Sequence, residues 1–169
     1  MSSNKSIFKI IEQKIYNSIN NQLKKVIKPN ITLKKVADID LYLIKKLKTE
    51  YGIGGIIVDV DETLRKDMMQ IPDCNKQWIE FMKSEFKVII LSNGYDGKVK
   101  KFANDRGIDY MSFAKKPLSK GMKTACAKMG LEPENVLVIG DDIVTDIYGG
   151  NRCGMLTAIV EDVDYEIDK

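Results

Sequence analysis

The chain has 169 residues, of which 44% are hydrophobic and 30% charged, so its composition is that of a folded domain with one buried core. Its formal net charge of +3 is too small to predict a nucleic-acid partner. The sequence contains no histidine, which excludes Ser-His and Cys-His catalytic centres and histidine-ligated metals. Any hydrolytic chemistry must therefore use carboxylates, lysine and hard metal ions with oxygen ligands.

The cysteines and the apolar runs bear on the compartment of the protein. Three widely spaced cysteines fit neither a disulfide framework nor a CxxC-type zinc site, so reduced thiols are expected. No apolar run approaches the roughly 18 to 20 residues that span a bilayer, and the N-terminus lacks the apolar region of a signal peptide. We therefore expect a cytoplasmic protein.

The first 28 residues carry a basic amphipathic pattern. Apolar residues recur there at steps of three to four and alternate with lysines, which predicts a helix over residues 1–28. The apolar positions are Ile7, Phe8, Ile11, Ile15, Ile19, Leu23 and Ile27. Two interpretations stay open. The helix packs on the rest of the protein, or residues 6–28 lie peripherally on the inner face of an anionic membrane.

Residues 29–169 are predicted to form one α/β domain. Short apolar runs, typical of strands buried on both faces, lie at residues 56–60, 88–91, 136–139 and 156–160. Helical patterns separate them at residues 73–83, 97–106 and 118–129. This alternation predicts a doubly wound parallel sheet. The intervals before and after the second run have room for one crossover each, so we expect no cap domain.

Polar residues follow the apolar runs. Because ligands bind outside the carboxyl ends of parallel strands, we expect these side chains to share one crevice. The first run ends in two aspartates two positions apart, the second in a hydroxyl and an amide, and the third in further aspartates. A proline also keeps one lysine out of the following helix. The resulting candidates are Asp59, Asp61, Thr63, Ser92, Asn93, Lys116, Asp141 and Asp146.

These residue types together suit phosphoryl transfer. An ionised carboxylate is a nucleophile at neutral pH, but at about 4 Å and an effective dielectric near 20 each like-charge pair costs roughly 4 kcal/mol. Mg2+ held by carboxylates offsets the repulsion between that carboxylate and a phosphate. The candidates for binding the phosphate oxygens are Thr63, Ser92, Asn93 and Lys116. Asp61 is placed to protonate the leaving oxygen and later to take a proton from water.

In this order the motifs resemble those of the haloacid dehalogenase (HAD) superfamily. DVDETL at 59–64, LSN at 91–93, Lys116 within KKP, and GDDIVTD at 140–146 are similar to its four motifs. The resemblance implies a HAD-type Rossmann-like fold, with Asp59 as nucleophile and Asp61 as acid/base. It also implies that Ser92 and Lys116 bind phosphate. The Mg2+ ligands that it implies are Asp59, the backbone carbonyl of Asp61, Asp141 and, through water, Asp146.

Longer segments resemble the class III-A YqeG-type phosphatases. These are KPNITLKKVADID at 28–40, AKKPL at 114–118 and GDDIVTDIYGGNRCG at 140–154. The group is related to phosphatidylglycerophosphate phosphatases of mitochondria and plastids, so the resemblance implies a phosphate monoester substrate and favours that phospholipid head group. Glu62 stands where the group usually has asparagine, and Asp142 where it usually has glutamine. The added negative charge can alter metal affinity or substrate choice.

Two other functions stay open. A non-catalytic α/β module could bind a partner through the N-terminal helix, and a receiver-like switch could be phosphorylated on Asp59. Asp61 argues against both, because neither needs a second carboxyl group placed for proton transfer. The sequence therefore favours a Mg2+-dependent phosphomonoester hydrolase that forms an aspartyl-phosphate intermediate.

Overall fold

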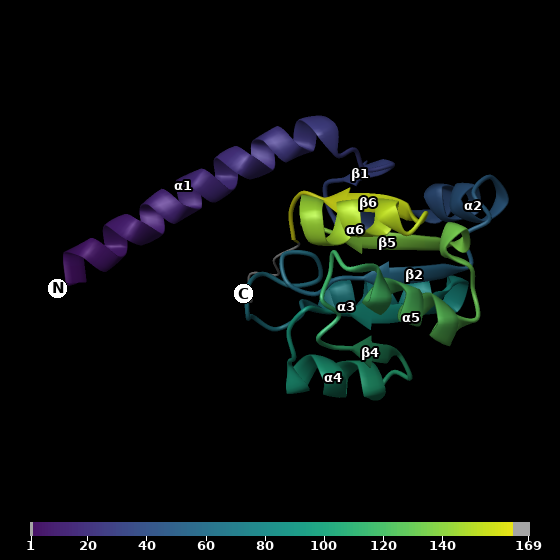
Figure 1. Ribbon diagram of the computed structural model, residues 1–169. Coiled ribbons are helices and arrows are strands. Elements are labelled where there is room, and N and C mark those ends of the chain that lie inside the picture. Colours follow the sequence, from purple (N-terminus) through teal and green to yellow (C-terminus); the bar gives the residue numbers. More distant parts are fainter. Residues whose placement is uncertain (1, 164–169) are drawn as a thin grey trace.

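Six parallel strands form one sheet in the computed structural model, which describes residues 2–163. The strand order is β1-β6-β5-β2-β3-β4, and every neighbouring pair is parallel. The strands are β1 (Ile31–Leu33), β2 (Gly55–Val58), β3 (Lys87–Leu91), β4 (Asp109–Met111), β5 (Val136–Gly140) and β6 (Leu156–Val160). The predicted doubly wound parallel sheet is confirmed (Figure 1).

Helices cover both faces of this sheet. These helices are α2 (Leu41–Thr49), α3 (Asp73–Glu85), α4 (Gly97–Asn104), α5 (Ser119–Met129) and α6 (Gly149–Arg152). A further helix, α1 (Ser2–Val26), precedes β1. Short 3-10 turns, η1 (Val36–Asp38) and η2 (Pro133–Asn135), and a π-helical segment, η3 (Ile143–Tyr148), complete the chain. Among residues 2–163 no separate cap domain interrupts the crossovers, as expected from their lengths.

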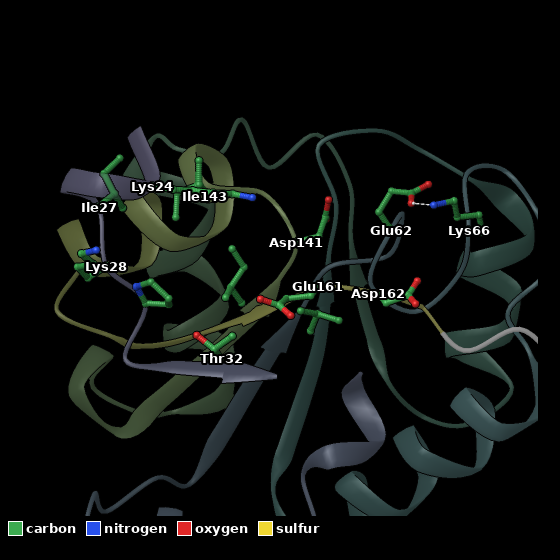
Figure 2. A pocket seen from close by; sticks show the side chains of 13 residues that line it. Lys24, Ile27, Lys28, Thr32, Glu62, Lys66, Asp141, Ile143, Glu161 and Asp162 are labelled. Carbon is green, nitrogen blue, oxygen red and sulfur yellow. Dashed lines mark ion pairs between the residues drawn. The ribbon is translucent and has the colours of Figure 1, made fainter. Parts of the chain in front are cut away.

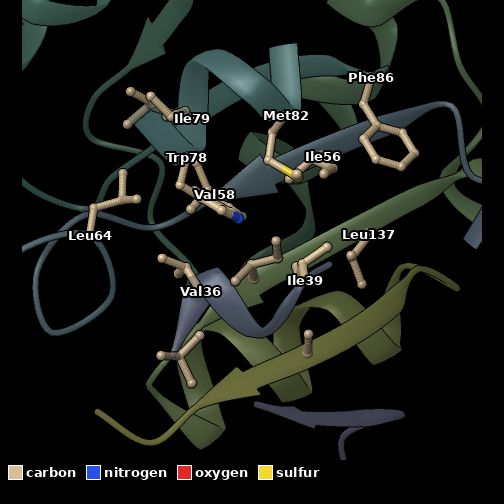
Figure 3. Close-up of a cluster of buried hydrophobic side chains, with 14 of the residues drawn as sticks. Val36, Ile39, Ile56, Val58, Leu64, Trp78, Ile79, Met82, Phe86 and Leu137 are labelled. Atoms are coloured by element: carbon tan, nitrogen blue, oxygen red, sulfur yellow. The ribbon is translucent and has the colours of Figure 1, made fainter. Parts of the chain in front are cut away.

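Two hydrophobic cores hold these layers together, one on each face of the sheet. Successive side chains of a strand point to opposite faces. Ile56 and Val58 of β2 belong to the core cluster that also contains apolar residues of α2, α3 and α4, whereas Ile57 belongs to the cluster that contains apolar residues of α5. Figure 3 shows the first core, where Trp78 and Met82 of α3 lie over β2. The long apolar runs of the sequence are thus explained by burial on both faces.

Element boundaries differ from the predictions by one or two residues. β2 ends at Val58, not at residue 60, so both aspartates of the first motif lie in the loop that follows. α5 begins at Ser119 and ends at Met129, and its C-cap is Gly130, whose φ of 65° is a left-handed conformation that glycine adopts without strain. The edge strands β1 and β4 were not predicted, because three residues are too few to show a periodicity.

Helix α1 contacts the domain through its C-terminal part and through the hydroxyl group of Tyr16, which donates to Asp142 Oδ2 at 3.0 Å. Leu23 and Ile27 pack against Ile143, Ile147 and Ile159. Farther from this contact, the apolar row Ile10, Ile11, Ile15 and Ile19 is about half exposed, at 46–55%, and this part of the helix extends beyond the α/β body (Figure 1). No helix among the described residues is long and apolar enough to cross a membrane.

A buried side-chain amide anchors the loop that carries the first motif. Asn75 of α3 is fully buried, and its Nδ2 donates to the backbone carbonyl of Leu64 at 2.8 Å. Replacing Asn75 by alanine should leave that carbonyl without a partner and cost about 1–3 kcal/mol of unfolding free energy. Urea unfolding followed by the fluorescence of Trp78 measures this.

Asn104→Ala, at an exposed position of α4, is the control, and its effect should stay within about 0.5 kcal/mol. Equal stability of the Asn75→Ala and Asn104→Ala proteins would contradict the anchoring role of Asn75.

Candidate active site

The candidate site lies at the topological switch point of the sheet, between β2 and β5. From β2 the chain runs to β3 on one side, and β5 lies on the other side of β2. Such a switch point leaves a crevice at the carboxyl ends of the two strands. Asp59 follows β2, and its backbone N–H donates to the carbonyl of Ile139 in β5 at 2.9 Å. Asp141 follows β5 directly.

Three carboxylates and one lysine meet in this crevice. Asp59, Asp141 and Asp146 each place a carboxylate oxygen within 4.8 Å of the others. The Nζ atom of Lys116 lies 2.8 Å from Asp59 Oδ1 and 2.6 Å from Asp146 Oδ1, and it also donates to the carbonyl of Leu91 at 3.2 Å. Lys116 and Asp146 are almost fully buried, at 6% and 1% exposure. Segments widely separated in sequence therefore share one charged cluster.

The cluster carries more negative charge than its lysine neutralises. Burial, together with repulsion from Asp146 and Asp59, raises the pKa of Asp141 to about 8. Burial and repulsion from Asp59 raise the pKa of Asp146 to about 7 despite the attraction of Lys116. Burial alone would lower the pKa of Lys116, but the two carboxylates that it contacts raise that pKa above its ordinary value. Such a cluster is stabilised by an additional cation.

The donor set suits a small divalent cation. The three carboxylates offer hard oxygen ligands close together, which suit a small divalent ion. The carboxylate of Asp61 lies outside this group and instead pairs with Arg65, whose Nε is 2.7 Å from Asp61 Oδ1.

Asp146 reaches the cluster because two local features allow it. A Cβ at position 140 would lie 2.2 Å from the carboxyl carbon of Asp146, so glycine is required there for the close approach. The side chain of Asp142 accepts hydrogen bonds from the N–H groups of Val144 and Thr145, both at 2.8 Å, and so begins η3. The Asp142 N–H in turn donates to Asp146 Oδ2 at 3.2 Å. Asp142 is thus a helix cap beside the cluster.

The polar residues near the acids make contacts within the protein. The buried Thr63 hydroxyl lies 3.3 Å from Asp141 Oδ1 and donates to it. Asn93 binds the backbone of Lys116 twice, accepting from its N–H at 2.7 Å and donating to its carbonyl at 3.0 Å. Ser92 Oγ accepts from the N–H of Gly94 at 3.2 Å. Thr63 and Asn93 therefore orient the residues that bear the charges.

Arg65 is a buried residue of the site that the sequence reasoning missed. It is 3% exposed, and it contacts both Asp61 and Asp96. Only three of the 27 basic residues in the chain are arginine, and Arg65 follows directly on the first motif. A rare arginine directly after the first motif is the sequence feature that could have identified Arg65 as a residue of the site.

A cleft of ≈ 600 Å³ adjoins the cluster at Asp141. Figure 2 shows Lys24 and Lys28 on one side of it, and the Glu62–Lys66 ion pair (2.8 Å) on the other. Glu62 also accepts a hydrogen bond from the N–H of Asp67 at 2.8 Å, which closes the loop after the first motif. The C-terminal turn of α1 therefore forms one wall of the space beside the acids.

Known proteins share this sequence and architecture. A HAD-hydrolase-like family model matches residues 113–165. The Bacillus subtilis protein named "Probable phosphatase YqeG" is 38% identical over 140 residues, covering 82% of this chain and 79% of that protein.

Two solved structures share the fold. The Pseudomonas syringae protein described as a "probable yrbi family phosphatase" superposes with a TM-score of 0.56 at 21% identity, over 73% of this chain and 74% of that one. The Legionella pneumophila protein described as a "putative HAD superfamily (subfamily III A) hydrolase" superposes with a TM-score of 0.50 at 17% identity, over 76% of each chain. The identity to YqeG over most of both chains shows the family, and this chain belongs to the YqeG-type group of the HAD superfamily.

Proposed function

We propose that this HAD-type phosphatase hydrolyses phosphate monoesters with Mg2+ as its metal and Asp59 as a covalent nucleophile. The observation that carries the proposal is the meeting of Asp59, Asp141, Asp146 and Lys116 at the switch point of the sheet. Mg2+ would be held by the three carboxylates, where it would neutralise part of the charge of the bound phosphate.

The residues of the chain account for both halves of the reaction. The Asp59 carboxylate attacks phosphorus, and the bond from phosphorus to the leaving oxygen breaks while Asp61 supplies the proton that this oxygen takes up. Water then attacks the phosphorus of the aspartyl-phosphate, and Asp61 removes its proton, so inorganic phosphate leaves and Asp59 is restored. Lys116, next to Asp59, neutralises charge on the transferred group. Ser92 and the neighbouring loop N–H groups are proposed to bind its remaining oxygens.

The substrate that we propose is phosphatidylglycerophosphate, on the resemblance to the YqeG-type group together with the shape of the site. The site has no lid within residues 2–163, so it suits a phosphate presented on a larger body. The cleft beside Asp141 is lined by the acids Glu161 and Asp162 and, on the side of α1, by Lys24 and Lys28. Those ammonium groups would pair with the phosphodiester that this head group carries besides its terminal monoester.

Helix α1 is proposed to bring the enzyme to the surface of an anionic membrane. Its isoleucine row is about half exposed, and the lysines of the same helix suit contact with acidic lipid head groups. The C-terminal turn of this helix lines the active-site cleft. Contact of α1 with lipid would therefore set the cleft beside the head groups.

Replacing Asp59 by asparagine should remove the nucleophile while keeping the fold. We expect phosphate release to fall on the order of a thousandfold or more, about 4 kcal/mol of barrier. Steady-state hydrolysis of an aryl phosphate and of phosphatidylglycerophosphate, each with and without MgCl2, measures this. Asp105→Asn, an exposed aspartate paired with Lys101, is the matched control and should keep wild-type turnover.

Near-normal Mg2+-dependent turnover of the Asp59→Asn protein would end the covalent mechanism. No turnover by the wild-type protein on any phosphate ester would favour a non-catalytic module.

The stability of the metal-free protein should fall as pH rises from about 6 to about 8. The pKa values of Asp141 (about 8) and Asp146 (about 7) lie above the ordinary carboxyl value, so the folded state binds more protons than the unfolded state in this window. Mg2+ binds the deprotonated carboxylates and should raise the melting temperature more at the higher pH. Differential scanning calorimetry at both pH values, with and without MgCl2, measures this.

The variant Asp141→Asn should lose most of the stabilisation by Mg2+. The metal assignment would be wrong if MgCl2 gave the wild-type protein an equal or larger gain at the lower pH.

The double variant Ile15→Asp/Ile19→Asp should weaken binding to vesicles of phosphatidylglycerol at least tenfold. Each buried isoleucine contributes roughly 1.5 kcal/mol or more when it leaves water, and the new carboxylates repel the anionic surface. Vesicle co-sedimentation measures the loss. Leu41→Asp/Tyr42→Asp, a matched change on exposed residues of α2, should bind like the wild-type protein.

Equal binding by the Ile15→Asp/Ile19→Asp protein and the wild-type protein would contradict the membrane role. Sedimentation velocity would test the rival, in which the isoleucine row joins two copies of the chain and the double variant turns a dimer into a monomer.

A further inference from the structure

We propose that Arg65, braced by Asp96, is a positioning residue that holds the carboxyl group of Asp61 against the leaving oxygen. The proposal rests on the function proposed above, in which Asp61 transfers the proton. Arg65 is 3% exposed, whereas the side chain of Asp61 is 45% exposed. A buried, rigid cation therefore contacts a carboxylate that otherwise faces solvent.

The two contacts of Arg65 fix its guanidinium group in one orientation. Nε lies 2.7 Å from Asp61 Oδ1, and Nη1 lies 2.9 Å from Asp96 Oδ2. Two carboxylates on different nitrogens of one planar group define its plane, which a single ammonium could not do. The arrangement links the loop after β2 to the start of α4.

Asp96 is itself held in place, so it can serve as the brace. Its Oδ1 accepts hydrogen bonds from the N–H groups of Lys98 at 2.8 Å and Val99 at 3.4 Å, as the cap of α4. Its own N–H donates to the hydroxyl oxygen of Tyr110 at 3.0 Å. The oxygen that meets Arg65 is the other one, Oδ2, so capping and bracing do not compete.

The backbone around Arg65 is fixed as well. Its N–H donates to the carbonyl of Val60 at 3.1 Å, and its carbonyl accepts from the N–H of Glu62 at 2.7 Å. Positions 61 and 65 form a parallel β-bridge. The loop thus places Arg65 beside Asp61 before any substrate arrives.

An uncapped site has particular need of this support. Residues 2–163 contain no lid that could close over Asp61 and orient it. Arg65 engages Oδ1 only, and among the described residues Oδ2 has no protein partner and is left for the proton in transfer. The contact with Arg65 would preorganise the proton donor Asp61 and so replace the orientation that a closing lid otherwise supplies.

Two phosphate esters with different leaving groups test this proposal. 2,4-Dinitrophenyl phosphate releases a stable anion and needs no proton donor, whereas phosphatidylglycerophosphate in mixed micelles releases an alkoxide-like oxygen and needs one. The measured quantity is kcat/KM, which covers the steps up to loss of the leaving group and excludes hydrolysis of the aspartyl-phosphate.

Arg65→Met should lower kcat/KM on the phospholipid on the order of a hundredfold, and on the dinitrophenyl ester by less than about fivefold. Asp61→Asn should likewise lower kcat/KM much more on the phospholipid than on the dinitrophenyl ester. Arg65→Lys should not restore the loss, because one ammonium cannot contact both carboxylates. Arg106→Met is the control, because it removes an arginine that pairs with Glu80 away from the strand ends. It should leave kcat/KM unchanged on both substrates.

Asp96→Asn is the second variant, because it keeps an oxygen to cap α4 but removes the charge that braces Arg65. It should lower kcat/KM on the phospholipid about tenfold and leave kcat/KM on the dinitrophenyl ester unchanged. Melting temperatures show which variants are folded. If Arg65→Met does not fold, Asp96→Asn still tests the proposal.

Equal losses on both substrates, or no loss on the phospholipid, would overturn the positioning role while leaving the phosphatase function intact. If the wild-type protein turned over neither ester, the proposed function would fall and this inference with it.

Discussion

The site depends on one charge arrangement, a buried ammonium group between two carboxylates. Lys116 lies 2.8 Å from Asp59 and 2.6 Å from Asp146, and Asp141 stands within 4.8 Å of both acids. Without Lys116, three acids would share a poorly solvated crevice, at a cost of several kcal/mol for each uncompensated charge. With it, the cluster still carries excess negative charge, which is the condition under which a divalent ion and then a phosphate can join it.

The fold supplies this arrangement through its connectivity. The central strands β2 and β5 are buried on both faces, so their carboxyl ends are rigid and adjacent. Asp59 and Asp141 are the first residues to leave these ends. The π-helical segment η3, started by Asp142, brings Asp146 back to the cluster, where its Oδ2 accepts from the N–H of Asp142. Leu23 of α1 and Ile27, which follows this helix, pack on the same segment.

The sequence was sufficient for those parts of the site that follow from local pattern. Asp59 and Asp141 could be placed because a polar residue after a doubly buried strand must lie at its carboxyl end. The partners of Thr63 and Asn93 could not be predicted, because they depend on contacts with segments 78 and 23 positions away. Arg65 was missed since charged side chains are rarely buried, and only the fold brings Asp96 to it. The three-residue strands β1 and β4 were missed because they are too short to show a period.

The most direct test of the covalent mechanism is to identify the atom that receives the phosphoryl group. The wild-type protein would be mixed with a phosphate ester and MgCl2, quenched rapidly and treated with borohydride, which reduces an aspartyl-phosphate to homoserine. Mass spectrometry of the peptide that contains residues 55–65 would then locate the change. The covalent mechanism predicts homoserine at position 59 and an unmodified Asp61. Homoserine at another aspartate, or none at all during steady turnover, would contradict it.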